Sequence, residues 1–259
     1  MTAASINQPP VVTINGVGKR FGTGPVVLDG IELAVARGEF VSLIGPSGCG
    51  KSTLLRLIAG LTDATAGSIS VEGMTPANAR ELMFFVFQDA NLLPWRRVAE
   101  NVELPLLLRG DGDEKRRERV AHMLEVVGLS AAATRYPWQL SGGMKMRVSI
   151  ARALSVAPDI LLLDEPFGAL DEMTRDKLNE DLLAIRERDP FTSFFVTHSV
   201  TEAVFLSSRI VVLSANPGRV ARVIDVPFGY PRVGELRETP EFLKLLGETT
   251  RALRDVRKP

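Results

Sequence analysis

Cysteine and histidine are scarce in this chain of 259 residues, which contains one cysteine, Cys49, and two histidines. A single cysteine cannot form a disulfide within the chain, and a metal site built from cysteine and histidine would lack ligands. The composition therefore favours a reducing compartment such as the cytoplasm and argues against a zinc-type centre.

Long hydrophobic runs are also lacking, because the longest unbroken apolar run is the six residues 82–87. A membrane-spanning helix needs about 20 apolar residues, so we expect that the chain does not cross a membrane by itself. The first basic residue is Lys19, and no apolar segment follows a charged start, so the sequence predicts no signal peptide.

Neither sign of charge is in excess, since 31 Lys and Arg residues balance 31 Asp and Glu residues. A neutral chain has no general attraction to nucleic acid or anionic lipid, although a local basic patch is compatible with it. The 45% of apolar and 24% of charged residues are ordinary for a globular protein. At about 150 residues per domain, the length suits one large domain, or one domain with a smaller lobe.

Short apolar segments alternate with helical periodicity along most of the chain, which predicts an α/β fold with a mostly parallel sheet. The predicted strands are residues 11–14, 26–28, 31–35, 40–44, 68–71, 83–87, 160–163, 194–196 and 210–213, with an edge strand at 219–226. The predicted helices are residues 51–61, 113–127, 142–156, 171–188, 201–206 and 240–256.

The segment between residues 88 and 140 differs from this alternation, because Pro94, Pro105, Gly110 and Gly112 interrupt it and a charged helix follows. We therefore expect a helical lobe, at about residues 89–157, inserted into a main domain of residues 11–226. Residues 1–10 are expected to form a flexible tail and residues 227–259 a short helical extension.

Residues 45–52 fit the pattern of a P-loop without a mismatch, and they follow a predicted strand and open a predicted helix. Glycines let backbone N–H groups converge on phosphate oxygens, and the helix start adds the positive end of its dipole. A lysine supplies charge to the β- and γ-phosphates, and a hydroxyl binds Mg²⁺. The predicted ATP-binding residues here are Gly45, Pro46, Ser47, Gly48, Cys49, Gly50, Lys51, Ser52 and Thr53.

Cys49 is interpreted as a small packing residue of this loop, and its position beside a helix start is expected to favour the thiolate.

Two carboxylates, Asp164 and Glu165, follow the apolar strand at 160–163. The carboxyl ends of parallel strands form the edge at which ligands bind in such sheets. Asp164 suits an Mg²⁺-linked role, and Glu165 suits polarising a water molecule for attack on the γ-phosphate. Many strands end in an acidic residue, so this pattern gains its weight from the P-loop that precedes it.

A second predicted helix start, at Ser141, Gly142 and Gly143, combines an N-capping serine with two glycines. Exposed backbone N–H groups at this start would form a second anion site, although the pattern alone also fits an ordinary N-cap. Two phosphate-binding helix starts in one chain indicate either two bound nucleotides or one nucleotide shared between two subunits.

The residues Leu140, Ser141, Gly142 and Gly143, followed by Met144, resemble the signature motif of ATP-binding-cassette (ABC) ATPases. The resemblance covers almost the whole chain, because further motifs follow in the order of that family. Phe21 matches the aromatic residue that stacks on adenine, and Gln88 matches the Q-loop glutamine. His198 matches the switch histidine, and the D-loop is matched by Ala169, Leu170 and Asp171.

This resemblance implies a P-loop NTPase cassette with a mostly parallel core sheet, an antiparallel β subdomain and the inserted helical subdomain. It implies ATP as substrate and Mg²⁺ as cofactor, with Ser52, Gln88 and Asp164 around the metal. The implied catalytic residues are Lys51, Gln88, Glu165 and His198. Two copies would enclose ATP, with the signature of each chain facing the P-loop of its partner.

Within the family, the chain is similar to importer ATPases of the nitrate, sulfonate and taurine group. Phe167, Met144, and residues 91–95, 216–219 and 236–242 carry this similarity, whereas Ser199, Ser208 and Met146 depart from the common pattern. The similarity implies separate membrane permease subunits that contact the segment from Gln88 to Leu108, and an extracytoplasmic solute-binding protein that acts indirectly. It also implies a peripheral place on the cytoplasmic face of the inner membrane, and no nucleic-acid partner.

Several alternatives remain open from the sequence. One alternative function is that of a soluble ABC ATPase not linked to transport. Another is that of a P-loop kinase, although such kinases usually lack the signature. The apolar residues 92–95 suit either a groove for a partner helix or internal packing. The charge run 114–119 indicates a solvated helix face, and the basic residues after Arg251 leave contact with a lipid surface open.

Overall fold

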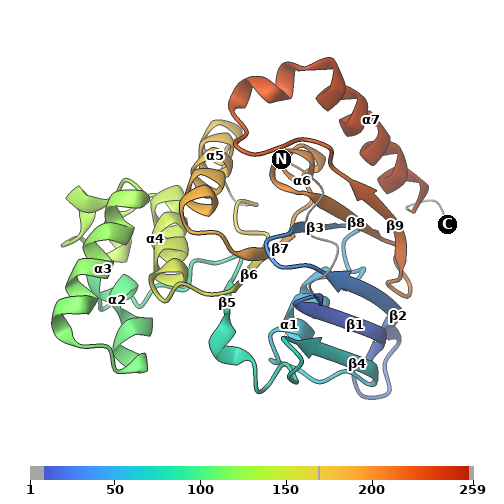
Figure 1. The fold of residues 1–259 in the computed structure, drawn as a ribbon, viewed down its shortest axis with the longest axis horizontal. Helices are drawn as coiled ribbons and strands as arrows, with labels where there is room; N and C mark the ends of the chain where they lie inside the picture. The colour runs from blue at the N-terminus through green and yellow to red at the C-terminus, as the bar shows by residue number, and fades with distance from the viewer. Residues whose placement is uncertain (1–8, 169, 257–259) are drawn as a thin grey trace.

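Two β-sheets form the body of the protein (Figure 1). The structure is a computed structural model, and it describes residues 9–168 and 170–256. The smaller sheet is antiparallel with the order β2-β1-β4, from β1 (Val12–Arg20), β2 (Val26–Val35) and β4 (Ala66–Val71). The larger sheet has the order β5-β6-β7-β3-β8-β9. Its strands are β3 (Phe40–Ile44), β5 (Met83–Val86), β6 (Ile160–Asp164), β7 (Thr192–Val196), β8 (Arg209–Leu213) and β9 (Val220–Asp225).

The larger sheet is parallel except for β9, which is antiparallel to β8. Its central strands β3, β6 and β7 are buried along their whole length, as expected for a parallel sheet covered on both faces. The predicted α/β class with a mostly parallel core sheet is therefore confirmed, together with the separate antiparallel sheet.

Side chains of β6 alternate between two hydrophobic cores. Leu162 belongs to the core that also contains β1, β2 and α1 (Lys51–Ile58), whereas Leu161 and Leu163 belong to the core beneath the other helices. This alternation is the period of two that a strand imposes. The helices of the second core are α2 (Val98–Arg109), α3 (Asp113–Val126), α4 (Gly142–Ser155), α5 (Glu172–Arg188), α6 (Val200–Leu206) and α7 (Pro240–Asp255).

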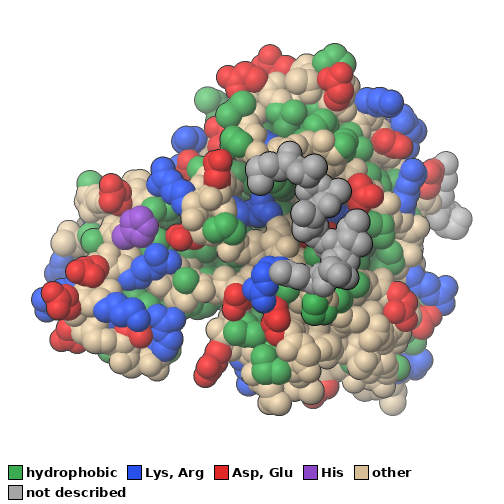
Figure 2. Space-filling view, in the orientation of Figure 1, with side chains coloured by type: hydrophobic (Ala, Val, Ile, Leu, Met, Phe, Trp, Pro, Cys, Tyr) green, Lys and Arg blue, Asp and Glu red, His purple; other side chains and the backbone are tan. Residues whose placement is uncertain are grey.

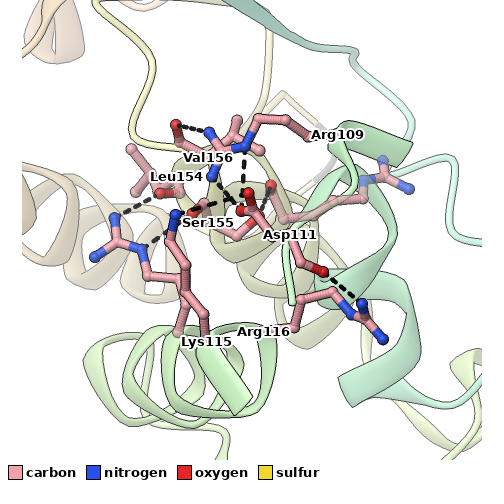
Figure 3. A network of polar contacts seen from close by, with 9 residues as sticks. Arg109, Asp111, Lys115, Arg116, Leu154, Ser155 and Val156 are labelled. Carbon is pink, nitrogen blue, oxygen red and sulfur yellow. Dashed lines mark hydrogen bonds and ion pairs between the residues drawn. The ribbon is translucent and has the colours of Figure 1, made fainter. Parts of the chain in front are cut away.

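The helices α2, α3 and α4 form a lobe to one side of the sheets (Figure 1). Figure 3 shows how polar contacts join them at the end of α4. Arg109 donates to the carbonyl oxygen of Val156 at 3.1 Å, and Arg119 donates to those of Ser155 at 3.0 Å and Leu154 at 2.9 Å. These bonds satisfy carbonyl groups that a helix end leaves unpaired, and they tie α2 and α3 to α4.

The charges of the lobe are mixed in sign, and Figure 2 shows basic and acidic side chains interspersed over its visible face. Arg116, from the charge run at 114–119, pairs with Glu103 at 2.8 Å and with Asp113 at 2.6 Å. Part of this run therefore joins elements within the lobe, in addition to the solvated face that the sequence indicates.

Two expectations about local structure are wrong. Pro105 does not interrupt the chain but lies inside α2, because the burial of Val102 and Leu106 compensates for the hydrogen bond that proline cannot form. The strands expected at 26–28 and 31–35 are one strand, β2. Gly30 adopts a φ of +59°, and the register against β1 shifts there by one residue, so a bulge replaces the expected break.

The chain after β9 packs against α6. Phe242 of α7 is buried, and the buried Arg232 donates to the carbonyl oxygens of Val204, Phe205 and Ser207 at 2.7 to 3.2 Å. The expected tail at residues 1–10 lies outside the described residues except for its last two positions. No helix in the described ranges combines the length and the apolar character that crossing a membrane requires.

Candidate nucleotide site

The P-loop, residues 45–52, joins the buried strand β3 to helix α1. Gly48 and Gly50 have φ angles of +77° and +95°, conformations that residues with a Cβ rarely adopt. Ser47 and Gly48 are exposed, and no side chain caps the start of α1. The helix start therefore offers free N–H groups and the positive end of its dipole to an anion from solvent.

Lys51 lies against the P-loop and is only 7% exposed. Its Nζ donates hydrogen bonds to the carbonyl oxygens of Gly45 at 3.0 Å and Pro46 at 3.1 Å. These bonds hold the ammonium group beside the loop, where its charge adds to the field of the helix start. Thr53, in the first turn of α1, is half-buried.

Cys49 of the same loop is fully buried. Burial raises the pKa of its thiol, and the neighbouring Lys51, whose Nζ lies 3.9 Å from Sγ, opposes this effect only in part. The expectation that the helix start favours the thiolate is wrong, because desolvation of a thiolate outweighs the attraction of the nearby charge.

Asp164 is brought next to Ser52 because β6 lies in the same sheet as β3, with only β7 between them. The Ser52 hydroxyl donates to Asp164 Oδ1 at 2.7 Å. Burial raises the pKa of Asp164, while this hydrogen bond acts in the opposite direction.

This pair of oxygen donors fits Mg²⁺, which usually takes one or two protein oxygens and completes its shell with water and substrate phosphates. Among the described residues there is no group of three or more His, Cys, Asp or Glu side chains that could hold a metal. The residues present therefore suit a metal that arrives with a phosphate substrate, rather than a closed protein cage.

Glu165 and His198 lie together beyond the ends of β6 and β7. His198 Nδ1 is 3.4 Å from Glu165 Oε2, and the Glu165 N–H donates to the carbonyl oxygen of Val196 at 3.0 Å. Glu165 has a φ of +48°, an unusual conformation for a residue with a side chain. Such strain is concentrated at functional sites, where the surrounding structure holds it in place.

A buried network behind His198 was not predicted from the sequence. The Thr197 hydroxyl donates to the carboxylate of Glu202, which is buried, and Arg175 Nε lies 3.4 Å from Glu202 Oε1. Arg175 also donates to the carbonyl oxygen of Leu170 at 2.9 Å. Burial raises the pKa of Glu202, with Thr197 and Arg175 acting against it.

This network joins the segment that carries His198 to the segment expected to be the D-loop. Ser199 caps α6 by accepting from the Glu202 N–H at 3.3 Å, so the spacing of a serine and a glutamate three residues later was an available signal. Nothing in the sequence pairs Arg175 with Glu202.

Two predicted site residues are not drawn into these contacts. Phe21 is 53% exposed and lies under Lys19, whose Nζ is 4.8 Å from the ring centroid. Gln88 is exposed just after β5, and within the described ranges its side chain has no hydrogen bond to Asp164 or Glu165. The exposed ring of Phe21 suits stacking against a flat base.

The signature segment lies at the start of α4, in the helical lobe (Figure 1). Ser141 caps the helix by accepting from the Met144 N–H at 3.3 Å, and both Ser141 and Gly142 are exposed. Leu140 is buried beneath them. A Cβ on Gly143 would come within 2.9 Å of a methyl carbon of Thr174, so only glycine fits there without a shift.

The expected D-loop adjoins this segment. Asp171 caps α5 by accepting from the Thr174 N–H at 3.0 Å, and this bond lowers the pKa of its carboxyl. Leu170 faces Gly142, since a Cβ on that glycine would lie 3.6 Å from the Leu170 side chain. Ala169 lies outside the described residues.

A P-loop at the carboxyl edge of a parallel sheet, with an acidic pair and a histidine at neighbouring strand ends, defines a P-loop ATPase. Comparison with known proteins identifies the family within this class. The family model described as ABC transporter matches residues 28–168. The chain belongs to this family, and it is an ATP-binding and ATP-hydrolysing cassette.

Curated relatives match over most of the chain. The aliphatic sulfonates import ATP-binding protein SsuB of Bacillus cereus (strain ZK / E33L) is 46% identical over 224 residues, 85% of this chain and 88% of that protein. The nitrate import ATP-binding protein NrtC of Synechococcus elongatus is 44% identical over 237 residues, which are 90% of this chain and 36% of NrtC.

A solved ATP-binding cassette, in a dimeric post-hydrolysis state with ADP and Pi, superposes with a TM-score of 0.75. It is 36% identical and is covered completely, with 85% of this chain aligned.

Proposed function

We propose that this chain is the energy-coupling ATPase of an importer for a small oxyanionic solute such as a sulfonate or nitrate. The support is the identity of 44–46% with import ATP-binding proteins named for aliphatic sulfonates and for nitrate. The observation that carries the catalytic part is the meeting of Ser52, Asp164, Glu165 and His198 at one edge of the sheet.

In the proposed binding step, the P-loop N–H groups and Lys51 surround the phosphates of ATP. Lys51 exchanges its bonds to Gly45 and Pro46 for bonds to phosphate oxygens, since a charged acceptor binds an ammonium group more strongly than a carbonyl does. Phe21 stacks on the base. Ser52, Asp164 and Gln88 would hold Mg²⁺, which would supply charge neutralisation for the β- and γ-phosphates.

In the proposed hydrolytic step, Glu165 orients and polarises the attacking water. His198 lies 3.4 Å from its carboxylate and contacts the γ-phosphate, where it stabilises the charge that develops during transfer. Glu165 has a left-handed backbone conformation, and its carboxylate lies beside His198.

The signature residues Ser141, Gly142, Gly143 and Met144 act in trans in this proposal. Ser141 and Gly142 are exposed at the helix start, and two copies of the chain would present each start to the partner's P-loop. The dimeric state of the solved cassette with ADP and Pi supports this arrangement. The D-loop, with Leu170 and Asp171, lies beside the signature and would meet the same interface.

The permease subunits are proposed to bind the segment from Gln88 to Leu108, on the cytoplasmic face of the inner membrane. Trp95 is 70% and Leu108 79% exposed, whereas Leu92 and Leu93 are half-buried, so only part of this apolar segment is available to a partner. Exposed tryptophan is typical of interface anchors. An extracytoplasmic binding protein would deliver the solute to the permease.

Transport in reconstituted vesicles tests the proposed function. The chain is combined with its co-purifying membrane subunits and binding protein, and uptake of labelled nitrate, an alkylsulfonate and taurine is measured with ATP inside. We expect ATP-dependent uptake of one of these oxyanions, and none with Lys51→Ala. ATP hydrolysis that no membrane subunit binds or stimulates would instead support the soluble ABC ATPase.

A further inference from the structure

The six residues between β8 and β9, Ser214 to Arg219, form what we call the bracing turn, and the end of β8 and this turn lie against the two ends of the P-loop. At one end, a Cβ on Gly45 would come within 2.7 Å of the carbonyl oxygen of Leu213, the last residue of β8. At the other end, a Cβ on Gly218 would lie 2.1 Å from the carbonyl oxygen of Cys49. Contact this close is possible only because both positions are glycine.

The bracing turn is also fixed to strand β2. The Gly218 N–H donates to the carbonyl oxygen of Val27 at 2.9 Å, and its own carbonyl accepts from the Asp29 N–H at 3.0 Å. Arg219 donates from Nε, at 3.0 Å, and from Nη2 to the Asp29 carboxylate. The turn therefore bridges the antiparallel sheet and the P-loop.

Strand β2 meets the P-loop at the same place. A Cβ on Gly50 would come within 2.5 Å of Leu28 Cδ2, and Leu28 forms an isolated bridge with Gly218. The peptide between Cys49 and Gly50 is thus enclosed by the turn on its carbonyl side and by β2 next to it. This peptide carries the N–H of Gly50, at the start of α1.

We propose that the bracing turn positions the P-loop for phosphate binding, with Gly218 and Arg219 as positioning residues. Gly218 holds the Cys49 carbonyl in place, and this fixes the direction of the Gly50 N–H. The Arg219–Asp29 pair keeps the turn on β2. The inference rests on the proposed role of the P-loop and adds to it an element that touches no nucleotide.

The proposal requires that the turn affects nucleotide binding more than turnover. A P-loop N–H that holds phosphates both before and in the transition state contributes uniform binding, so its misplacement raises KM and leaves kcat almost unchanged. A turn that only stabilises the fold would lower Tm and the active fraction, and would leave KM as it is.

The first variant is Gly218→Ala, with Gly229→Ala as the matched control. Neither glycine has a left-handed φ, and a Cβ on Gly229 meets nothing within 4 Å, so the two alanines differ in what the new methyl group contacts. We expect Gly218→Ala to raise KM for ATP about 10- to 100-fold, the effect of one lost hydrogen bond to a charged phosphate. The kcat of the folded protein stays within about threefold of the control.

The second variant, Arg219→Ala, decides the matter if Gly218→Ala does not fold. The Arg219 side chain is 61% exposed, so its loss leaves the core intact. We expect KM to rise about two- to fivefold, because exposed ion pairs are weak, and Arg219→Lys to restore most of it.

Lys51→Ala, measured in parallel, distinguishes a failure of the positioning role of the turn from a failure of the proposed role of the P-loop. A KM equal to that of Gly229→Ala in both turn variants overturns the positioning role, provided that Lys51→Ala abolishes binding or hydrolysis. If Lys51→Ala has no effect either, the proposed role of the P-loop itself is wrong.

Discussion

The P-loop and the signature segment are both glycine-containing helix starts, but their surroundings differ. The P-loop is enclosed by the bracing turn and by β2, contains the buried Lys51, and touches Asp164 through Ser52. No side chain caps α1, whereas Ser141 caps α4. Ser141 and Gly142 face solvent, and neither α1 nor α4 has an acidic residue in its first turn.

In the proposed assignment, one chain therefore carries a fixed phosphate cradle and a separate anion contact with little support around it. The cradle lies at the sheet edge, and the signature segment lies in the helical lobe (Figure 1). The cradle is expected to bind ATP alone. The signature segment, at an exposed helix start, is expected to act only on phosphates that another copy already holds.

The largest loss of hydrolysis is expected from Glu165→Gln. The amide keeps the size and hydrogen bonding of the side chain but removes the basic carboxylate, so hydrolysis should fall roughly 10²- to 10⁴-fold, the usual range for a general base. ATP binding should persist, because residues 45–52 are unchanged. Phosphate release and binding of a fluorescent ATP analogue measure the two quantities, and unchanged hydrolysis would remove Glu165 from the catalytic role.

Lys51→Ala tests the cradle at its charge. The substitution removes the ammonium group held at Gly45 and Pro46, and activity should fall on the order of 10²-fold or more, as for other preorganised electrostatic groups. Circular dichroism and Tm serve as the folding control. A folded Lys51→Ala protein with normal ATP hydrolysis contradicts the assignment of the P-loop.

Ser141→Arg tests the other side of the comparison. A bulky side chain at an exposed helix start should block the partner's nucleotide, so hydrolysis should fall about 10²-fold while ATP affinity of the isolated chain stays normal. Ser141→Ala is the comparison variant, because it removes the hydroxyl without adding bulk, and the lost cap should cost about 0.5–2 kcal/mol of stability. Equal loss of ATP affinity and hydrolysis in Ser141→Arg would mean that the signature acts within its own chain.

Asp164→Asn should raise the stability of the protein and lower its ATP hydrolysis. Burial raises the pKa of Asp164, so the folded state binds this proton more tightly than the unfolded chain. Its contribution to stability is complete below the ordinary pKa and is lost as the pH rises through the raised value. The neutral amide avoids this loss, so Tm at neutral pH should rise by about 2–4 °C for each kcal/mol gained.

The Tm measurement is repeated at acidic pH, where the wild-type carboxyl is protonated. The gain of Asp164→Asn should shrink there, and a gain that does not depend on pH would exclude the proposed cause. Hydrolysis by this variant should be strongly reduced, since a donor for Mg²⁺ is lost.

Sequence patterns predicted the elements whose signals are contiguous. The strand before Gly45 and the helix after it, the strand before Asp164, and the capping start at Ser141 were all within a few residues of their structural positions. The helical lobe was also anticipated. Each of these depends on local periodicity or on a turn residue, which a single segment of sequence contains.

Contacts between distant segments were not predictable. The pairing of Arg175 with Glu202 and the approach of Gly218 to Cys49 depend on how β8, α5 and the P-loop pack together. The bulge at Gly30 was misread because glycine marks both a strand end and a bulge.

The most direct test of the division into cradle and signature is the mass of the Glu165→Gln protein in solution. We expect size-exclusion chromatography with light scattering to give the monomer mass of 28.2 kDa without nucleotide and twice that mass with ATP. Adding Ser141→Arg should return the mass to that of the monomer while ATP remains bound. A Glu165→Gln protein that binds ATP but stays monomeric at high concentration, or a dimer that persists with Ser141→Arg, would contradict the shared site.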